Sequence, residues 1–332
     1  MRALPADRPG PGAGSVTGRI TRWADDLQRH HAVLGLPYAV IKKYGDDAGV
    51  RHSALITYFG FLSIFPAMLL VVAVTSRILQ ANPSLRDDLI DQIVPERFHD
   101  IVAEGLASMP DTGWPYVVGV IGLLYAGTGV VESAYVTLNH LVGIRHRERR
   151  GFVARYAYDA LVLLVVLLGV VVGSGTGLLV AALPGAGLVE RSASFLGMFA
   201  VIFVVLVTAA RLLIVRRVSL RAAWPAAAIG ALLTAAIITG GSTLVAMSTA
   251  GAGAVYGSFA AVVGIFAVMY FVSQSLVFSA ETAVVLRRRL WPRALDQARP
   301  TAADVRALTM LAREQERVPG QRVDVRFVEV AS

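Results

Sequence analysis

The spacing of charged residues constrains this chain more than any other feature. Five long stretches contain no Asp, Glu, Lys or Arg. They lie between Arg51 and Arg77, Asp111 and Glu132, Asp159 and Glu190, Arg191 and Arg211, and Arg221 and Glu281, and they contain 25, 20, 30, 19 and 59 residues in that order. A helix needs roughly 20 apolar residues to span a bilayer core, whereas a buried helix of a globular domain rarely needs more than about 14. The stretches therefore predict a membrane protein.

The last stretch is long enough for two spans, and its small polar and glycine residues at 248–258 predict a turn between them. We therefore expect an all-α polytopic membrane protein, a bundle of six transmembrane helices with amphipathic flanking helices. The predicted spans are 53–76, 115–142, 157–182, 194–214, 223–247 and 257–286. A content of 55% hydrophobic and 16% charged residues agrees with this class.

Arginine is concentrated in alternate connections between the predicted spans. The net charge of +8 by itself would also suit a nucleic-acid-binding protein. The basic residues instead fill the connection between spans two and three, the one between spans four and five, and the segment after span six: Arg145, Arg147, Arg149, Arg150, Arg155; Arg211, Arg216, Arg217, Arg221; Arg287, Arg288, Arg289, Arg293. The positive-inside rule then predicts a protein of the inner (plasma) membrane with both termini in the cytoplasm and no nucleic-acid partner.

The flanking segments predict three further pieces. Residues 1–52 form a cytoplasmic leader without a signal peptide, with a juxtamembrane amphipathic helix built on Val16, Ile20, Trp23 and Leu27. The transmembrane domain covers 53–286 and includes an outer amphipathic segment at 80–112, which either connects two spans or acts as a gating lid.

Residues 287–332 form a cytoplasmic tail. Thr301 and Asp304 predict the capping box of a soluble helix, with Val305, Leu308 and Leu311 on one side. The alternation of residues 323–330 predicts an edge strand.

Polar residues inside the spans are the candidate functional residues, because an ionisable group in a bilayer needs a partner, a watery cavity or an interfacial position. Counting from the nearest basic residue places Asn139 and Glu281 in one inner layer and Glu132 deeper, near the midplane. We expect Glu132, Asn139 and Glu281 to line a polar cavity open to the cytoplasm. The structural alternative is that Glu281 pairs with an inner arginine such as Arg211.

Two features bear on helix shape and packing. Pro66 lies inside the first span, where it removes one backbone hydrogen bond, and Ser63 can satisfy a freed carbonyl, so we expect a kinked helix. The kink is either a hinge or static packing geometry. Gly169, Gly173 and Gly177 recur every four residues in the third span, which predicts close helix packing within the bundle, with dimerisation as the alternative.

Three segments resemble the YihY/BrkB family of integral membrane proteins, formerly mislabelled ribonuclease BN. They are ALITYFGFLSIFP at 54–66, VGVIGLLYAGTGVVESAYVTLNHLVGI at 117–143 and YGSFAAVVGIFAVMYFVSQSLVFSAETAVVL at 256–286. The chain departs from the family pattern after Glu281, where Thr282 and Ala283 replace a Leu-Asn pair. The resemblance implies a six-helix inner-membrane protein associated with virulence, envelope integrity and export of lipids or solutes.

The residues indicate no enzyme. The six histidines show no metal-ligand spacing, and the glycine-rich segment at 251–257 follows no strand, so we expect neither a cofactor nor a metal. Two functions remain: a transporter or flippase for an amphiphile, a lipid or a small solute, or an envelope scaffold that acts through partner binding. The expected partners are the lipid bilayer and a lipid or small-molecule substrate, and the oligomeric state stays open.

Overall fold

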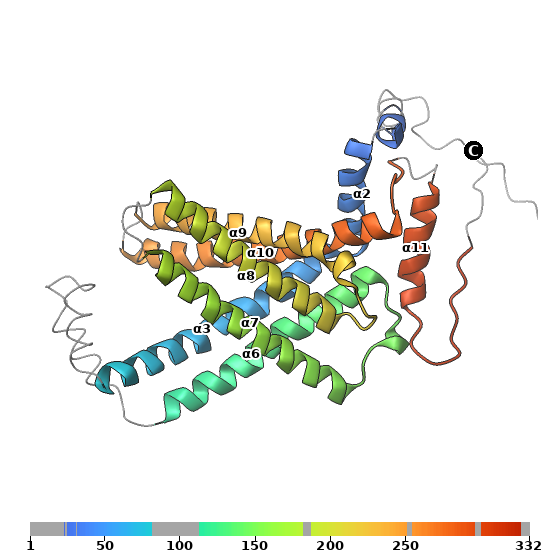
Figure 1. The fold of residues 1–332 in the computed structure, drawn as a ribbon. Coiled ribbons are helices and arrows are strands. Elements are labelled where there is room, and N and C mark those ends of the chain that lie inside the picture. The colour runs from blue at the N-terminus through green and yellow to red at the C-terminus, as the bar shows by residue number, and fades with distance from the viewer. Residues whose placement is uncertain are drawn as a thin grey trace, which may run out of the picture. The chain divides into compact units, whose positions relative to one another are not determined.

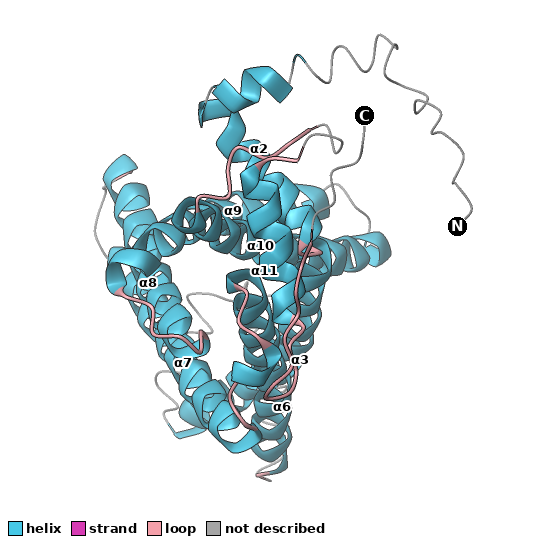
Figure 2. Cartoon of the chain, turned by 90° about the vertical axis from the view of Figure 1, so that its right-hand side faces the viewer, coloured by secondary structure: helices cyan, strands magenta, loops and turns pink. Residues whose placement is uncertain are grey.

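The computed structural model describes residues 23, 25–30, 32–81, 113–181, 187–250, 254–295 and 300–326. All regular secondary structure in these ranges is helical, as Figure 2 shows. The larger helices are α2 (Ala32–Asp46), α3 (Gly49–Ala81), α6 (Trp114–Val142), α7 (Phe152–Ala181), α8 (Leu188–Leu213), α9 (Leu220–Ala250), α10 (Ala254–Arg288) and α11 (Ala302–Glu314). Residues 82–112, which hold nearly all of the expected outer amphipathic segment, lie outside the described ranges.

Six of these helices are long and apolar enough to cross a membrane, which confirms the predicted all-α class. Their spanning stretches are Gly49–Leu70, Trp114–Val142, Phe152–Gly173, Ser192–Leu213, Leu220–Gly241 and Val262–Arg288. The protein leaves large apolar side chains on these helices uncovered; Val171, for example, is 68% exposed and Leu196 is 62% exposed. Lipid chains would cover such surfaces in a bilayer.

The chain divides into two structural units, Leu55–Glu132 and the remainder. In the larger unit, α7 packs against α8, α8 against α9, and α9 against α10, while α2 packs against α10. Ala39 and Val40 of α2, Val285 of α10 and Ala307 of α11 share one buried apolar cluster. In Figure 1, α2 (blue) and α11 (red) accordingly lie at the same end of α10 (orange). We call this end, which carries Arg287, Arg288 and Arg289, the arginine-rich end.

The smaller unit pairs parts of α3 and α6 through glycines. A side chain added at Gly119, Gly122 or Gly129 would come within 2.9 Å of Leu70, Pro66 or Phe59, respectively. The hydroxyl of Tyr116 also donates a hydrogen bond to the carbonyl of Ala73 over 2.6 Å. Small residues on α6 therefore let the two backbones approach closely.

Two spanning helices end in tight turns at the arginine-rich end of the larger unit. Gly143 (φ +73°) follows α6, and the amide of Ile144 donates to the carbonyl of Asn139 over 2.9 Å. Arg289 (φ +51°) follows α10, and the amide of Leu290 donates to the carbonyl of Val285 over 3.0 Å. Both patterns satisfy helix-end carbonyls, and they direct the chain into the segments that hold α11.

The tail helix begins as the sequence predicted. Thr301 caps α11, and the reciprocal hydrogen bonds with Asp304 form a capping box. The expected apolar side is wrong in part, because Leu308 is 41% exposed while Ala303, Asp304, Ala307 and Glu314 are buried. Residues 323–326 form no strand, and the rest of the expected edge strand lies outside the described ranges.

Candidate functional site

Helix α2, which sequence reasoning did not predict, supplies the central residue of the site. Its Tyr44 ring stacks on Phe278 of α10 with centroids 4.1 Å apart, and this contact fixes α2 beside the membrane-spanning helix. Lys42 and Lys43 lie in its last turns. They are the only lysines among the 31 basic residues of the chain.

Lys43 lies between two carboxylates, and we call Lys43, Asp47 and Glu281 the Lys43 cluster. The ammonium of Lys43 is 2.8 Å from Oε2 of Glu281 on α10, and it also donates to Asp47. A third bond runs to the carbonyl of Leu141 on α6 over 3.3 Å. All three residues are at most 5% exposed, and Glu281 is completely buried. One side chain thus joins α2, α6 and α10 at the arginine-rich end.

The neighbouring carboxylates of Glu281 and Asp47 keep Lys43 protonated. Burial by itself would lower the pKa of Lys43, but the negative charges of Glu281 and Asp47 outweigh burial and hold the pKa above its ordinary value. The lysine is therefore a permanent cation at neutral pH, inside a region that water does not reach.

Two histidines lie next to the Lys43 cluster. Nε2 of His140 on α6 is 3.2 Å from the backbone oxygen of Asp47, and Nδ1 is 2.6 Å from Oε2 of Glu314. The rings of His140 and His52 are 4.9 Å apart, and Nδ1 of His52 is 3.0 Å from the hydroxyl of Thr137. A chain of titratable groups thus connects the start of α3 and the end of α6 with the tail helix.

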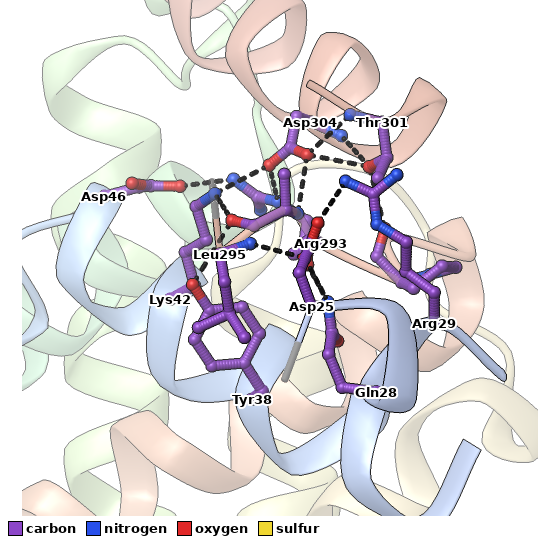
Figure 3. A network of polar contacts seen from close by, with 12 residues as sticks. Asp25, Gln28, Arg29, Tyr38, Lys42, Asp46, Arg293, Leu295, Thr301 and Asp304 are labelled. Carbon is purple, nitrogen blue, oxygen red and sulfur yellow. Dashed lines mark hydrogen bonds and ion pairs between the residues drawn. The ribbon is translucent and has the colours of Figure 1, made fainter. Parts of the chain in front are cut away.

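A second polar cluster holds the start of the tail helix, and Figure 3 shows it. We call Lys42, Asp46, Arg293, Thr301 and Asp304 the Asp304 cluster. Oδ1 of Asp304 accepts bonds from Nε of Arg293 over 2.6 Å and from Nζ of Lys42 over 3.0 Å. The other guanidinium arm of Arg293 reaches Asp46 over 2.6 Å. Arg293 is 1% exposed and Asp304 is 3% exposed, so their ion pair is shielded from water, whereas Asp46 and Lys42 lie at the edge of the cluster.

The pKa of Asp304 reflects these contacts. Burial by itself would raise the pKa, but hydrogen bonds from Arg293 and from the amides of Ala294 and Thr301 outweigh burial and hold it well below its ordinary value. The carboxylate is therefore ionised at every physiological pH, as a pair with two cations requires.

The end of the tail helix is held by the connection between α6 and α7. Glu314 accepts a bond from Nη2 of Arg149 over 2.6 Å, in addition to its contact with His140. Glu316 lies 2.9 Å from Nη2 of Arg147 and 3.3 Å from Nε of Arg145. Arginines that the sequence marked as topological signals thus also hold the tail in place.

Asn139 and Glu281, two of the residues that the sequence predicted to line one cavity, have different partners in the larger unit. Glu281 contacts Lys43 and not the suggested Arg211, which is exposed, so that expected pairing was wrong. Asn139 is completely buried, and its amide nitrogen donates to the carbonyls of Tyr135 and Leu213 over 2.8 and 2.9 Å. Its side-chain oxygen accepts a hydrogen bond from the amide of Val215, so Asn139 caps the C-terminal end of α8. The described contacts of Glu281 and Asn139 go to different partners, and a shared cavity stays a prediction.

Glu132 is half-buried and is the last residue of the smaller unit. In the same unit, α3 continues through Pro66 as one helix, and Ser63 donates to the carbonyl of Gly60 over 2.6 Å. A side chain at Gly122 would lie 2.9 Å from the Pro66 ring, so α6 packs directly on the proline. The sequence allowed two roles for the Pro66 kink, a hinge or static packing geometry, and this contact agrees with packing.

The glycines of α7 differ in their surroundings. A Cβ at Gly169 would lie 2.5 Å from a methyl group of Val205 on α8, whereas one at Gly173 would lie an ordinary 3.7 Å from Val201. Gly177 lies in α7, and its surroundings are outside what the structure describes. Gly169 therefore serves close packing between α7 and α8, within the bundle.

The fold and these clusters define a polytopic α-helical membrane protein with a tail helix built into one end of its bundle. A family model described as virulence factor BrkB matches residues 40–304. The chain belongs to this family, as the resemblance of its first, second and last spans implied.

Two relatives support the assignment. The chain is 27% identical over 182 residues to an uncharacterized protein of Dickeya dadantii (strain 3937), a match that covers 51% of this chain and 55% of the relative. It is 25% identical over 181 residues to the inner membrane protein YhjD of Escherichia coli (strain K12), with 52% and 53% covered. The chain thus matches about half the length of each of these relatives. No solved structure matches it.

Proposed function

We propose that the protein moves an amphiphile, a lipid or a small solute, across the inner membrane, with the arginine-rich end and both termini on the cytoplasmic side. The observation that carries the proposal is Glu281, an ionisable side chain that is completely buried in a membrane-spanning helix. Such a group costs about 2.5 to 3.5 kcal/mol on insertion, so its presence favours a role in a substrate or ion pathway. The Escherichia coli relative is an inner membrane protein, which supports the location.

The proposal assigns no enzymatic step to the chain. In the described ranges, no group of three or more His, Asp or Glu side chains could hold a metal ion. A nucleic-acid partner is not part of the proposal either, because Arg145, Arg147 and Arg149 are engaged by acidic residues of the same chain.

A scaffold that binds partners through its tail is the weaker alternative. The acidic side chains of α11 that a basic partner would use, Asp304 and Glu314, are turned toward the chain's own cations. Deleting residues 291–332 would therefore remove Arg293, Thr301 and Asp304 of the Asp304 cluster together with Glu314, the partner of His140, and would damage a transporter as well as a scaffold. Single substitutions separate the two functions better than a deletion does.

The test is movement of fluorescent phospholipids in vesicles that contain the purified full-length protein. Dithionite bleaches a labelled lipid only in the outer leaflet, so bleaching beyond that leaflet reports lipid movement. We expect extra bleaching with the wild-type protein, loss of it with Glu281→Gln, and retention with Glu148→Gln, a matched change at a surface carboxylate. Wild-type vesicles that bleach like protein-free vesicles with labelled phosphatidylglycerol and phosphatidylethanolamine would show that the chain moves no lipid of this kind.

A further inference from the structure

The ammonium of Lys43 faces three acceptors. An ammonium group carries three N–H bonds, and they match the three acceptors around it: Asp47, the carbonyl of Leu141 and Glu281. The cation is thus shared between two carboxylates on two different elements. Both carboxylate oxygens of Glu281 are buried and accept no hydrogen bond from any described residue, and Oε1 also lies outside the ion pair that Oε2 forms with Lys43.

A count of charges in the Lys43 cluster leaves one negative charge in excess. Asp47 and Glu281 each carry one when ionised, and Lys43 balances one of them. The other titratable groups facing the cluster are His140 of α6 and His52 of α3. His140 turns its Nδ1 toward Glu314 of α11 and its Nε2 toward the backbone oxygen of Asp47, so among the described residues Lys43 is the one cation in an ion pair with the carboxylates of Asp47 and Glu281.

An uncompensated charge in a buried region is unfavourable by several kcal/mol, and the usual remedy is binding of a proton. The geometry offers a place for it, because protonated Oε1 of Glu281 can become a donor without disturbing Oε2, which faces Lys43. The transfer is a simple acid–base equilibrium: one proton passes between bulk water and the carboxylate, and no other bond changes.

We propose that the Lys43 cluster is a proton-binding site in which Glu281 takes up and releases one proton. When Glu281 is protonated, Lys43 is paired with Asp47 alone, and the interaction between α2 and α10 is weak. In the ionised form, the ion pair of Lys43 with Glu281 joins the two helices. The use of this proton to drive substrate movement rests on the proposed function, whereas the binding itself does not.

The choice of lysine fits this role. A chain with 31 basic residues uses arginine everywhere except at positions 42 and 43. An ammonium is a compact point charge whose donors point in three directions, as the three acceptors here require, whereas a guanidinium presents its donors in one plane. A guanidinium would also hold Glu281 through two parallel bonds, which would oppose its protonation.

Infrared difference spectroscopy of the full-length protein in lipid nanodiscs tests the proposal. A protonated carboxylic acid has a carbonyl band that ionisation removes, so a titration from acid to alkaline pH reports each buried carboxyl. We expect one such band, absent in Glu281→Gln and present in Glu148→Gln. If no band titrates in the wild-type protein, or if the band persists in Glu281→Gln, the proton site is refuted.

A second variant keeps the test decisive if Glu281→Gln fails to fold. Asp47→Asn removes the excess charge and leaves Lys43 to Glu281, so the midpoint of the band should move to lower pH by about 1 to 3 units. An unchanged midpoint would overturn the proposal. This measurement needs no substrate, so a failed lipid-movement assay would reject the transport function and leave the proton site standing, and the reverse also holds.

Discussion

The interaction of Asp304 with its two cations leads to the sharpest prediction about the tail. The substitution Asp304→Asn keeps the shape of the side chain and removes its charge. Arg293, which is 1% exposed, and Lys42 then lose the carboxylate that lies 2.6 and 3.0 Å from their nitrogens. Part of the cap at Thr301 remains, because an amide oxygen can still accept the backbone hydrogen bonds of Thr301 and Ala294.

The size of the effect follows from burial. Removing one partner of a buried ion pair costs about 3 to 5 kcal/mol when the other charge is left without compensation. The cost is smaller here, because Arg293 keeps Asp46 and Lys42 is partly exposed, so the loss is that of hydrogen bonds to a charged group, about 1.5 to 3 kcal/mol. The apolar contacts of α11, including those of Ala307, are unchanged by the substitution. We therefore expect the free energy of opening α11 away from the bundle to fall by about 1.5 to 3 kcal/mol, which corresponds to a roughly 10- to 160-fold increase in the open fraction.

Hydrogen exchange of the amides of residues 302–314 in the detergent-solubilised protein measures this opening directly. Exchange in Asp304→Asn should accelerate by the same factor. The control is Asp324→Asn, a matched change at an exposed aspartate of the tail, which should exchange at the wild-type rate. If the two variants exchange within about threefold of each other, the ion pairs do not hold the tail helix and the interpretation of the Asp304 cluster is wrong.

Three further predictions concern stability. Asn139→Ala should lower the unfolding free energy by about 1 to 3 kcal/mol, visible as a lower melting temperature in detergent, because the buried carbonyl of Leu213 loses its donor; an unchanged melting temperature would contradict this role. In the same assay, Gly169→Ala should cost about 1 to 3 kcal/mol through overpacking, while Gly173→Ala should stay within about 1 kcal/mol of wild type; equal effects would contradict the packing geometry. The pKa of Asp304 is lowered by folding, so its contribution to stability is fully present well above its ordinary pKa and is lost as the pH falls through and below that value. The opening free energy of α11 in the wild-type protein should therefore show no dependence on the titration of Asp304 between pH 6 and 8 and should fall below about pH 4, and Asp304→Asn should lack this fall.

The membrane architecture was predictable because a bilayer leaves few alternatives. Runs of uncharged residues longer than about 19 specify spans by length alone, and the structure has six such helices. The capping box of Thr301 and Asp304 was equally readable, since it depends on residues only three positions apart. In both cases the determining interactions are local.

The candidate site was only half predictable. Glu281 was identifiable as an ionisable residue inside a span, but its partner lies 238 residues earlier in the chain (281 − 43) on a helix that contains Pro37. Proline at position 37 disfavours a helix over residues 32–46 by local propensity. One signal was available: the only two lysines of an arginine-rich chain are adjacent there. Periodicity gives no information about which distant charges will meet, because that depends on tertiary packing.

Neighbouring residues of α2 connect the tail with the membrane. Successive side chains on a helix point about 100° apart, so Lys42 and Lys43 face different sides of α2. Lys42 pairs with Asp304 of the tail helix, and Lys43 pairs with Glu281 of the spanning helix α10. A change in the charge of Glu281 would alter how firmly α2 is held to α10, and α2 would carry that change to the contacts of α11. The two clusters are therefore physically linked through one short helix.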